Sequence, residues 1–307
     1  MSKVILVVGA TASGKSQVAV NLAKKFNGEI VSCDSMQIYK NMDIGTAKIT
    51  LDEMQGIKHH LIDVVDAVSD FSVGEYACMA DDAIADILSR GKTPIVVGGT
   101  GLYVDGILYP MTFGGVKDVQ IRQELEEELA KYGKDYMYAM LVNIDPDDAE
   151  KIHPNNVKRV LRALEIYRIT GNRKSNLQEK SKNMKYEVCM IALNLDRKLL
   201  YNRINARVDK MFEMGLLREI KDLLSKGINF ENQSMQAIGY KEFKEYLSAD
   251  KTLEETIETI KQNSRNYAKR QLTWFKKYDF AKWYSPDDSL GIEREVKAFL
   301  EGAKYEI

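Results

Sequence analysis

The sequence predicts an α/β fold made of a parallel sheet core flanked by helices, together with an all-helical insertion domain. In the N-terminal part, short apolar and β-branched runs alternate with helical patterns, which is typical of a parallel sheet. Between residues 115 and 182 the helical periodicity is nearly continuous, and it resumes after one further strand-like run. We therefore expect a core built from residues 1–114 and 183–307, with the insertion domain over residues 115–182.

Four segments carry the strand signal of short, mostly apolar and β-branched composition, and these are residues 4–8, 29–33, 94–97 and 187–193. Helices are predicted where apolar residues recur every three or four positions, namely over residues 17–26, 73–89, 121–131, 147–152, 155–169, 199–224, 240–247 and 253–277. The stretch 137–144 is apolar at nearly every position, so its pattern does not distinguish a strand from a helix.

The first predicted strand is followed by the stretch GATASGKS, which fits the phosphate-loop pattern GxxxxGK[ST] in the required position between a strand and a helix. Glycines let backbone N–H groups surround an anion, the helix N-terminus adds its dipole, Lys15 supplies charge and Ser16 can ligate Mg²⁺. We expect a P-loop NTPase-like core whose phosphate-binding residues are Gly9, Ala10, Thr11, Ala12, Ser13, Gly14, Lys15 and Ser16. The pattern alone does not say whether the phosphates belong to ATP.

An acidic residue, Asp34, follows the second predicted strand, at the edge where open α/β sheets bind ligands. The strand over residues 94–97 ends in two glycines, so it supplies no acid of the kind that holds Mg²⁺ in ATP-consuming phosphate-loop proteins. Three roles remain open for Asp34: metal ligand, general base, or cap of a following helix. Its polar neighbours Ser35, Gln37 and Tyr39 favour the base, because such groups recognise nucleobases; a loop that is merely polar is the alternative.

The composition, with 45% hydrophobic and 29% charged residues and a net charge of −1 over 307 residues, is that of a soluble globular protein. From His153 to Lys185 nine Lys and Arg residues stand against two Glu, a pattern of either a solvated helix face or a surface that binds a polyanion. The three cysteines are isolated, which indicates neither a zinc site nor a disulfide framework and favours a reducing compartment. Without an 18-residue apolar run or room for a signal peptide, we expect a cytoplasmic protein.

Seven motifs resemble those of the tRNA dimethylallyltransferases, also called tRNA isopentenyltransferases, in order and approximate spacing. They are GATASGKS, DSMQIYKNMDIGTAK, HHLIDVVD, GGTGLY, IHPNNVKRVLRALEIY, QAIGYKE and NYAKRQLTWF, and the resemblance as a whole extends over residues 3 to about 284. Family members often have proline where Ala10 stands, a change that leaves the backbone cradle intact. The sequence lacks the C-terminal zinc-finger extension of eukaryotic members, so it looks like a bacterial member.

The resemblance implies that the phosphate loop holds the diphosphate of dimethylallyl diphosphate, whose allyl group moves to N6 of the adenine 3′-adjacent to the anticodon in tRNA. It implies catalytic roles for Asp34 as general base, for Lys15 and Arg207 at the diphosphate, and for Thr100 against the adenine. It also implies Mg²⁺ as a cofactor, held by Ser16, and a protein that we expect to be monomeric with no membrane partner.

The resemblance further implies that the target base is extruded from its stack and read by the segment after the second strand. The expected tRNA contacts are Asp34, Ser35, Met36, Gln37, Thr100, Arg122, Lys158, Arg159, Arg162, Gln236, Gly239, Tyr240, Lys241, Arg265, Lys269 and Arg270, with Tyr267 and Trp274 as stacking candidates. The Arg and Lys residues of this set are expected to grip phosphates.

Three other functions share parts of these patterns. A small-molecule kinase uses the same loop for ATP, but the paired glycines after the strand over residues 94–97 and the long basic insertion argue against it. An enzyme that transfers a prenyl group to a free adenine nucleotide would not need a C-terminal segment that matches tRNA-acting enzymes, and this sequence has one. A non-catalytic RNA-binding protein has no need of intact Lys15, Ser16 and Asp34.

Overall fold

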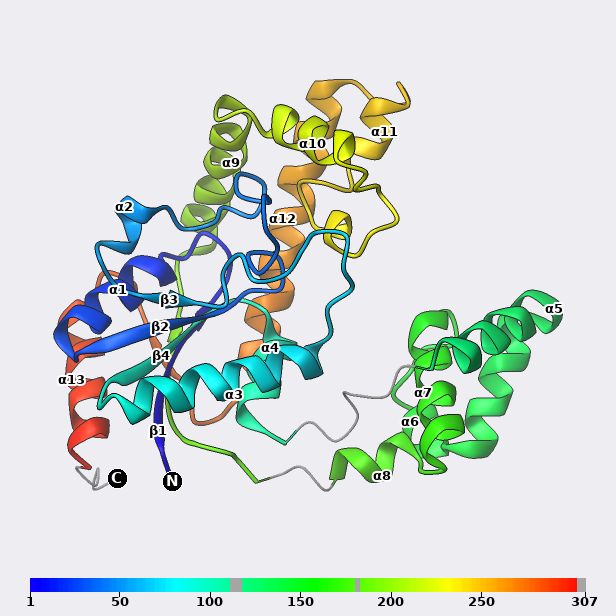
Figure 1. Ribbon diagram of the computed structural model, residues 1–307, viewed down its shortest axis with the longest axis horizontal. Coiled ribbons are helices and arrows are strands. Elements are labelled where there is room, and N and C mark those ends of the chain that lie inside the picture. The colour runs from blue at the N-terminus through cyan, green and yellow to red at the C-terminus, as the bar shows by residue number, and fades with distance from the viewer. Residues whose placement is uncertain (111–117, 180–182, 303–307) are drawn as a thin grey trace. The chain divides into compact units, whose positions relative to one another are not determined.

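The computed structural model describes residues 1–110, 118–179 and 183–302, and Figure 1 shows the course of the chain. The expected junction at Gly114 and Gly115 lies outside the described residues. The chain divides into two compact units. The first contains Met1–Phe71, Cys78–Ile107 and Tyr186–Ile307, and the second contains Ser72–Ala77 and Leu108–Lys185. In the described residues, no helix has both the length and the apolar character that crossing a membrane requires.

The first unit is built on a parallel sheet of six strands in the order β3-β2-β4-β1-β5-β6. The strands are β1 (Lys3–Gly9), β2 (Gly28–Cys33), β3 (His59–His60), β4 (Thr93–Gly98), β5 (Glu187–Leu193) and β6 (Lys282–Tyr284). Register aligns the carboxyl ends of the middle strands, because Val8 and Cys33 both pair with Gly98. The loops that follow β1, β2 and β4 therefore begin side by side at one edge of the sheet.

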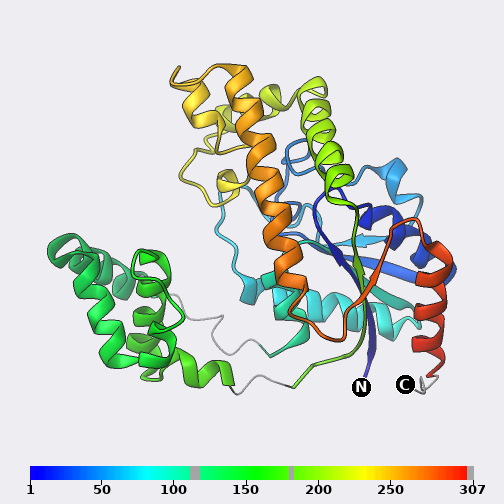
Figure 2. The same ribbon diagram turned by 180° about the vertical axis from the view of Figure 1, so that it is seen from behind.

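Helices cover this sheet and continue beyond its carboxyl edge (Figures 1 and 2). They are α1 (Lys15–Lys25), α2 (Leu51–Met54), α3 (Val73–Ser89), α4 (Gly101–Leu108), α9 (Arg197–Glu213), α10 (Leu216–Ser225), the short 3₁₀ helix η1 (Ser234–Gln236), α11 (Phe243–Leu247), α12 (Leu253–Phe275) and α13 (Ser289–Glu301). The apolar faces of α1 and α13 close the core over β1, β4 and β5. α9 and α12 run side by side in both views and pack through Leu200, Ile204 and Ala268.

The second unit is a helical assembly of α5 (Val119–Ile144), α6 (Pro146–Ala149), α7 (Val157–Thr170) and α8 (Lys174–Glu179). Its core joins Leu125, Met137 and Leu141 of α5 to Val160, Leu161 and Leu164 of α7. The ambiguous stretch 137–144 is helical, since Met137 and Leu141 are one turn apart and both are fully buried. α5 is interrupted at Gly133, where φ is 81° and ψ is 170°.

The α/β prediction is confirmed, and the four predicted strands are present, whereas several element boundaries differ. The helix predicted over residues 199–224 is wrong as a single element, because Gly215 adopts a φ of 96° and separates α9 from α10. The helix predicted over residues 147–152 is the shorter α6. The edge strands β3 and β6 were not predicted, since two or three residues carry no periodic signal.

Candidate active site

The phosphate loop connects β1 to α1 in a conformation that depends on its glycines. Gly9 has a φ of 154°, and a Cβ there would lie 2.9 Å from the carbonyl oxygen of Leu193. Gly14, at the N-cap of α1, has a φ of 91° in the left-handed region. Because Gly14 caps the helix without a side-chain hydrogen bond, the N-terminus of α1 is left to a ligand in the cavity that the loop lines.

Lys15 folds back onto this loop, where its Nζ donates to the carbonyl oxygen of Ala10 at 2.6 Å. Burial, and secondly the neighbouring charge of Arg207, lower the pKa of Lys15 to about 7. Both causes act because the ammonium lies away from water beside another cation. An anion in this cavity would offset the repulsion between Lys15 and Arg207 and provide the countercharge that the two cations lack.

Asp34 begins the turn that leaves β2, and it holds this turn with one of its two oxygens. Oδ1 accepts the backbone N–H groups of Met36 and Gln37 at 2.9 and 3.3 Å. In the described residues Oδ2 has no hydrogen-bond partner, and Asp34 lines two adjoining cavities. The capping role that the sequence left open is therefore present, and it leaves the second carboxylate oxygen available for chemistry.

The loop after β4 supports the same turn. Thr100 Oγ1 accepts the N–H of Ser35 at 3.1 Å and donates to Ser35 Oγ at 3.4 Å. Gly98 is required at the end of β4, because a Cβ there would lie 2.0 Å from the carbonyl oxygen of Cys33. The last position of β4 therefore has no room for a side chain and cannot supply an acid of the kind that holds Mg²⁺ in ATP-consuming phosphate-loop proteins.

Helix α12 joins the phosphate loop to the loop after β4. Gln271, which is 5% exposed, accepts the N–H of Thr11 at 2.8 Å and donates to the carbonyl oxygen of Gly99 at 2.9 Å. One turn earlier, Tyr267 hydrogen-bonds with the side chain of Thr100, while burial and the nearby Asp34 raise the pKa of its hydroxyl to about 12. Tyr267 therefore remains a protonated donor beside Asp34 at neutral pH.

Arg207 reaches the phosphate loop from α9. Its Nη1 donates to Thr11 Oγ1 at 3.4 Å, and burial lowers its pKa although the carboxylates of Glu53 and Asp34 act in the opposite direction. Arginine remains charged in proteins, so the guanidinium is a fixed positive charge facing the loop. With Lys15 it gives the cavity two cations.

Two adjoining cavities meet at these residues. The first, of about 280 Å³, lies along the phosphate loop and also contains Asp34, Glu53 and Gln271 in its walls. The second, of about 310 Å³, lies between α9, α12 and the turns over residues 45–47 and 236–241. Both volumes are near the lower end of the range for small-molecule sites. The walls that the two cavities share are Thr11, Asp34, Thr46, Ala47, Arg207 and Tyr267.

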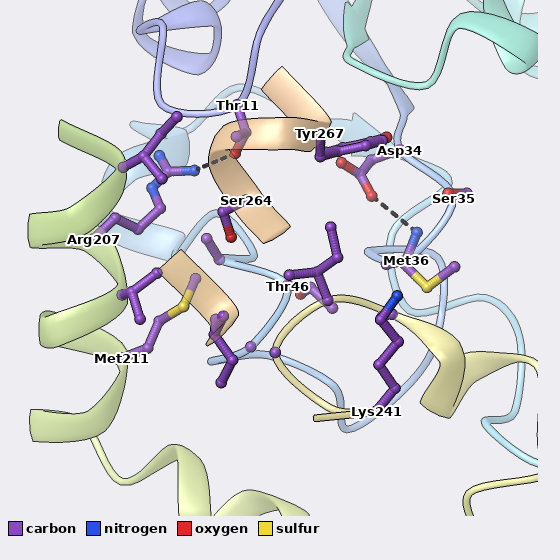
Figure 3. A pocket seen from close by; sticks show the side chains of 18 of the residues that line it. Thr11, Asp34, Ser35, Met36, Thr46, Arg207, Met211, Lys241, Ser264 and Tyr267 are labelled. Carbon is purple, nitrogen blue, oxygen red and sulfur yellow. Dashed lines mark hydrogen bonds between the residues drawn. The ribbon is translucent and has the colours of Figure 1, made fainter. Parts of the chain in front are cut away.

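Figure 3 shows that opposite sides of the second cavity carry different kinds of side chain. Helix α9 contributes Arg207 and Met211 on one side. Ile204 and Val208 of the same helix also line this cavity. The opposite side carries Asp34, Ser35 and Met36, and Lys241 approaches from the turn over residues 236–241. An apolar group attached to an anion at Arg207 can therefore lie along α9 while a polar planar group faces Asp34.

Most sequence-predicted residues of the first unit lie at this site, and four of them have contacts within the protein that differ from the expected ones. Gln236, Gly239, Lys241 and Arg270 line the second cavity, and Lys269 is exposed on α12. The amide of Gln37, expected to read a base, instead donates to the carbonyl oxygens of Thr46 and Ala47 at 3.3 and 3.1 Å. The side chain of Tyr240, expected to contact tRNA, is fully buried and cannot reach an RNA.

Two other expected contacts of α12 are occupied within the protein. Arg265 donates to Asn205 Oδ1 at 2.6 Å and to Gln262 Oε1 at 2.7 Å. The ring of Trp274 covers Gly101, where a Cβ would lie 2.4 Å from ring carbons, and Lys277 lies over its other side at 4.3 Å from the ring centroid. Trp274 therefore packs α12 on α4 and is not available as a stacking platform.

The four basic residues of the second unit that were predicted to contact tRNA fall into two groups. Lys158 and Arg159 are exposed on α7. Arg162 and Arg122 converge on Glu165, which is 4% exposed, with N–O distances of 2.9 and 3.8 Å. Arg162, from the basic run between His153 and Lys185, therefore balances a buried acid, whereas Lys158 and Arg159 of the same run are exposed.

Sequence reasoning missed Gln271, Glu53 and the stretch 45–47 as parts of the site. Gln271 and Tyr267 are one helical turn apart in the motif NYAKRQLTWF, so their spacing was a usable signal for a shared face. Their partners lie more than 160 residues away along the chain, which no local pattern reports. Among the described residues, no group of three His, Cys, Asp or Glu side chains has the arrangement of a metal site.

Comparison with known proteins matches the chain to isopentenyl transferases and dimethylallyltransferases. The model of a family described as IPP transferase matches residues 37–278, and that of a family described as isopentenyl transferase matches residues 2–70. The tRNA dimethylallyltransferase of Thermoanaerobacter sp. (strain X514) is 50% identical over 304 residues, which cover 97% of this chain and 96% of that protein. The protein of the same name from Bacillus mycoides is 47% identical over 302 residues, with coverage of 98% and 95%.

Solved structures give the same result. The tRNA isopentenylpyrophosphate transferase of Bacillus halodurans is 45% identical with a TM-score of 0.75, and the match covers 98% of each chain. A eukaryotic dimethylallyltransferase acting on tRNA is 33% identical with a TM-score of 0.87, and the match covers 100% of this chain and 81% of that one.

Proposed function

This chain belongs to the family of tRNA dimethylallyltransferases, and on that premise we propose how its site carries out the transfer. The dimethylallyl group of dimethylallyl diphosphate moves to N6 of an adenine in tRNA, and diphosphate is released. The adenine 3′-adjacent to the anticodon is the proposed target. One observation carries the assignment of roles: the two cavities share Asp34 and Arg207, so an acid and a fixed cation stand where donor and acceptor would meet.

The diphosphate is proposed to occupy the cavity along the phosphate loop. Breaking the allylic C–O bond leaves both electrons on the diphosphate, so negative charge grows there during the reaction. Lys15, Arg207 and the N-terminus of α1 surround this position, and preorganised positive groups are effective where charge develops. The buried Lys15, whose pKa is lowered without an anion, gains its countercharge from this ligand.

The adenine is proposed to enter the second cavity with N6 toward Asp34. The exocyclic amine is a weak nucleophile, because its lone pair is delocalised into the ring. As the bond between N6 and the allylic carbon forms, N6 loses a proton, and Oδ2 of Asp34 is the base available to take it. The hydrogen bonds to Oδ1 fix the orientation of this carboxylate, and Tyr267 and Thr100 form the adjacent wall.

We propose Mg²⁺ as the cofactor, as the family implies, with Ser16 as its protein ligand. The donor chemistry fits, since Ser16, Asp34 and Glu53 place hard oxygen atoms in the walls of the phosphate-loop cavity. Mg²⁺ typically keeps several waters and is held by few protein oxygens together with substrate phosphates. When bound, the ion would help to neutralise the charge of the departing diphosphate.

The remainder of the tRNA is proposed to contact exposed basic residues of both units, each through its phosphates. These residues are Lys158 and Arg159 on α7 and Lys241, Lys269 and Arg270 in the first unit. We also propose a cytoplasmic location, and the three free cysteines of the described residues are consistent with such a reducing compartment. We propose that the protein acts as a monomer.

The test is transfer of a labelled dimethylallyl group. The protein is incubated with Mg²⁺, labelled dimethylallyl diphosphate and unmodified tRNA, with AMP as an alternative acceptor and ATP as an alternative loop ligand. Label should appear in an adenine of the tRNA, and neither AMP nor ATP should yield a product. A prenylated AMP at a comparable rate would favour the free-nucleotide enzymes, and a phosphorylated product with ATP would favour a kinase.

A further inference from the structure

We infer that Glu219 is a positioning residue that holds the loop over residues 43–47 as the common wall of the two cavities. The inference deepens the proposed function and rests on it, because the loop matters for catalysis only if the two cavities hold the two substrates. Glu219 lies in the first turn of α10 and itself lines neither cavity.

The carboxylate of Glu219 accepts four hydrogen bonds. Oε2 accepts the backbone N–H groups of Asp43 and Ile44 at 2.9 and 2.7 Å. Oε1 accepts the N–H of Gly45 at 3.1 Å and the hydroxyl of Tyr240 at 2.6 Å. Three consecutive backbone N–H groups that point to one anion form a nest, and the anion fixes the course of the loop.

The fourth donor, Tyr240, makes the arrangement rigid. Its side chain is fully buried, and a Cβ at Gly45 would lie only 2.5 Å from the tyrosine ring. Glycine is therefore the residue that lets the loop lie directly against the ring. Burial and the charge of Glu219 raise the pKa of the Tyr240 hydroxyl, so it stays a donor to the carboxylate.

The clamped loop continues directly into the walls of the site. Thr46 and Ala47 line both cavities, and their carbonyl oxygens accept the amide of Gln37, three residues after Asp34. Helix α10, which carries Glu219, directly follows α9, which carries Arg207. Glu219 thus links α10, the helix that follows the one carrying Arg207, to the loop that supports the segment carrying Asp34.

A positioning role predicts a specific kinetic effect. Binding of tRNA depends mainly on contacts spread over its backbone, whereas turnover depends on the alignment of N6, Asp34 and the allylic carbon. A misplacement of about 1 Å at a reacting centre can cost about 10²-fold in rate. Releasing the loop should therefore lower kcat while the KM for tRNA changes little.

The test variant is Glu219→Gln, which keeps the shape but turns one oxygen into an amide that faces N–H donors. We expect kcat to fall by about 10- to 100-fold, with the KM for tRNA within about 3-fold of wild type. Hydrogen exchange of the amides of residues 43–45 should be at least about 10-fold faster, with the amides of β1 unchanged. The control is Glu213→Gln, the same chemical change at an exposed position of α9, which should alter none of these values.

Two results with a folded Glu219→Gln variant would contradict the inference. Unchanged exchange at residues 43–45 would mean that the carboxylate does not hold the loop. Faster exchange with normal kcat would make Glu219 a structural residue without effect on the chemistry. If Glu219→Gln does not fold, Glu219→Asp, which keeps the charge but is too short for all four donors, is measured in the same way. A wild-type protein inactive on tRNA would contradict the proposed function, and the inference would fall with it, whatever the exchange rates show about the contact.

Discussion

At the scale of single residues, the two carboxylate oxygens of Asp34 have different surroundings, and the proposed base uses only one of them. Its Oδ1 holds the backbone of the turn after β2, and its Oδ2 faces the cavities without a partner among the described residues. The sequence placed this carboxylate at the correct edge of the sheet, because strand ends can be predicted from apolar runs. The sequence did not predict which of the two oxygens is hydrogen-bonded, because this depends on the geometry of the turn.

Lys15 is the residue whose loss should most directly weaken binding of the diphosphate. In the Lys15→Ala variant the cavity loses one of its two cations, and charge-assisted hydrogen bonds contribute about 1.5–3 kcal/mol each. We expect the dissociation constant of Mg²⁺-diphosphate, measured by calorimetry, to rise by about 10-fold or more. Lys24→Ala removes an exposed lysine from the same helix and should leave this constant unchanged. Equal affinity for the Lys15→Ala variant would mean that the diphosphate does not lie on this loop.

At the scale of elements, α12 illustrates what a linear motif can and cannot tell. Its motif NYAKRQLTWF resembles a segment of tRNA-acting enzymes, which predicts tRNA contacts for Lys269 and Arg270. Both residues are exposed. Tyr267 and Gln271 of the same helix fasten the phosphate loop to the loop after β4, and Arg270 lies over the Tyr267 ring. The motif located the helix correctly, but its partners follow from packing with segments that are far away in the sequence.

Helix α7 of the second unit carries a prediction about tRNA affinity. Arg162 is paired with the buried Glu165, whereas Lys158 and Arg159 are the exposed basic residues of this helix. The double variant Lys158→Ala, Arg159→Ala should bind tRNA more weakly. Each lost contact should flatten the dependence of log affinity on log salt by about 0.7 to 0.9.

Filter binding across a salt series measures this slope, with Lys297→Ala on α13 as the control for a lost exposed lysine. Diphosphate affinity should be normal in both variants. The same slope and the same affinity as wild type would make Lys158 and Arg159 an ordinary solvated face.

At the scale of the whole molecule, the α/β class, the four main strands and the helical nature of the insertion could be predicted from periodicity. The break at Gly215 could not, because apolar positions continue in phase from α9 into α10. Nor could the contact of Glu219 with residues 43–45, which joins segments more than 170 residues apart. Local patterns define elements, and the assembled site depends on long-range contacts that they do not encode.

Glu29 at the start of β2 provides a stability test for the sheet. It is 3% exposed and accepts hydrogen bonds from Arg90 and Lys92 in addition to its contact with His60. The hydrogen bond from Arg90 is the main cause that holds the pKa of Glu29 well below its usual value. A carboxylate with a lowered folded-state pKa stabilises the protein above its unfolded-state pKa of 4.5, and this contribution is lost as the pH falls further.

We expect Glu29→Gln to lower the unfolding free energy by about 1–3 kcal/mol at pH 7, in the range for buried groups that lose a charged partner. The difference in urea midpoint from wild type should shrink as the pH is lowered from 5 toward 3. Asp86→Asn, which changes the exposed second partner of Arg90, should have a much smaller effect. A midpoint difference that is the same at both pH values would exclude the ionised carboxylate as the source.

The central claim is that Asp34 takes the proton from N6 of the adenine while the phosphate loop holds the departing diphosphate. Single-turnover transfer from labelled dimethylallyl diphosphate to unmodified tRNA, compared between wild type and Asp34→Asn, tests it most directly. The amide keeps the cap on the turn through its oxygen but cannot accept the proton. The rate should therefore fall by about 10² or more, with the affinities for tRNA and diphosphate retained. A variant that transfers the label at a near-normal rate would contradict this account and leave Asp34 with its capping role alone.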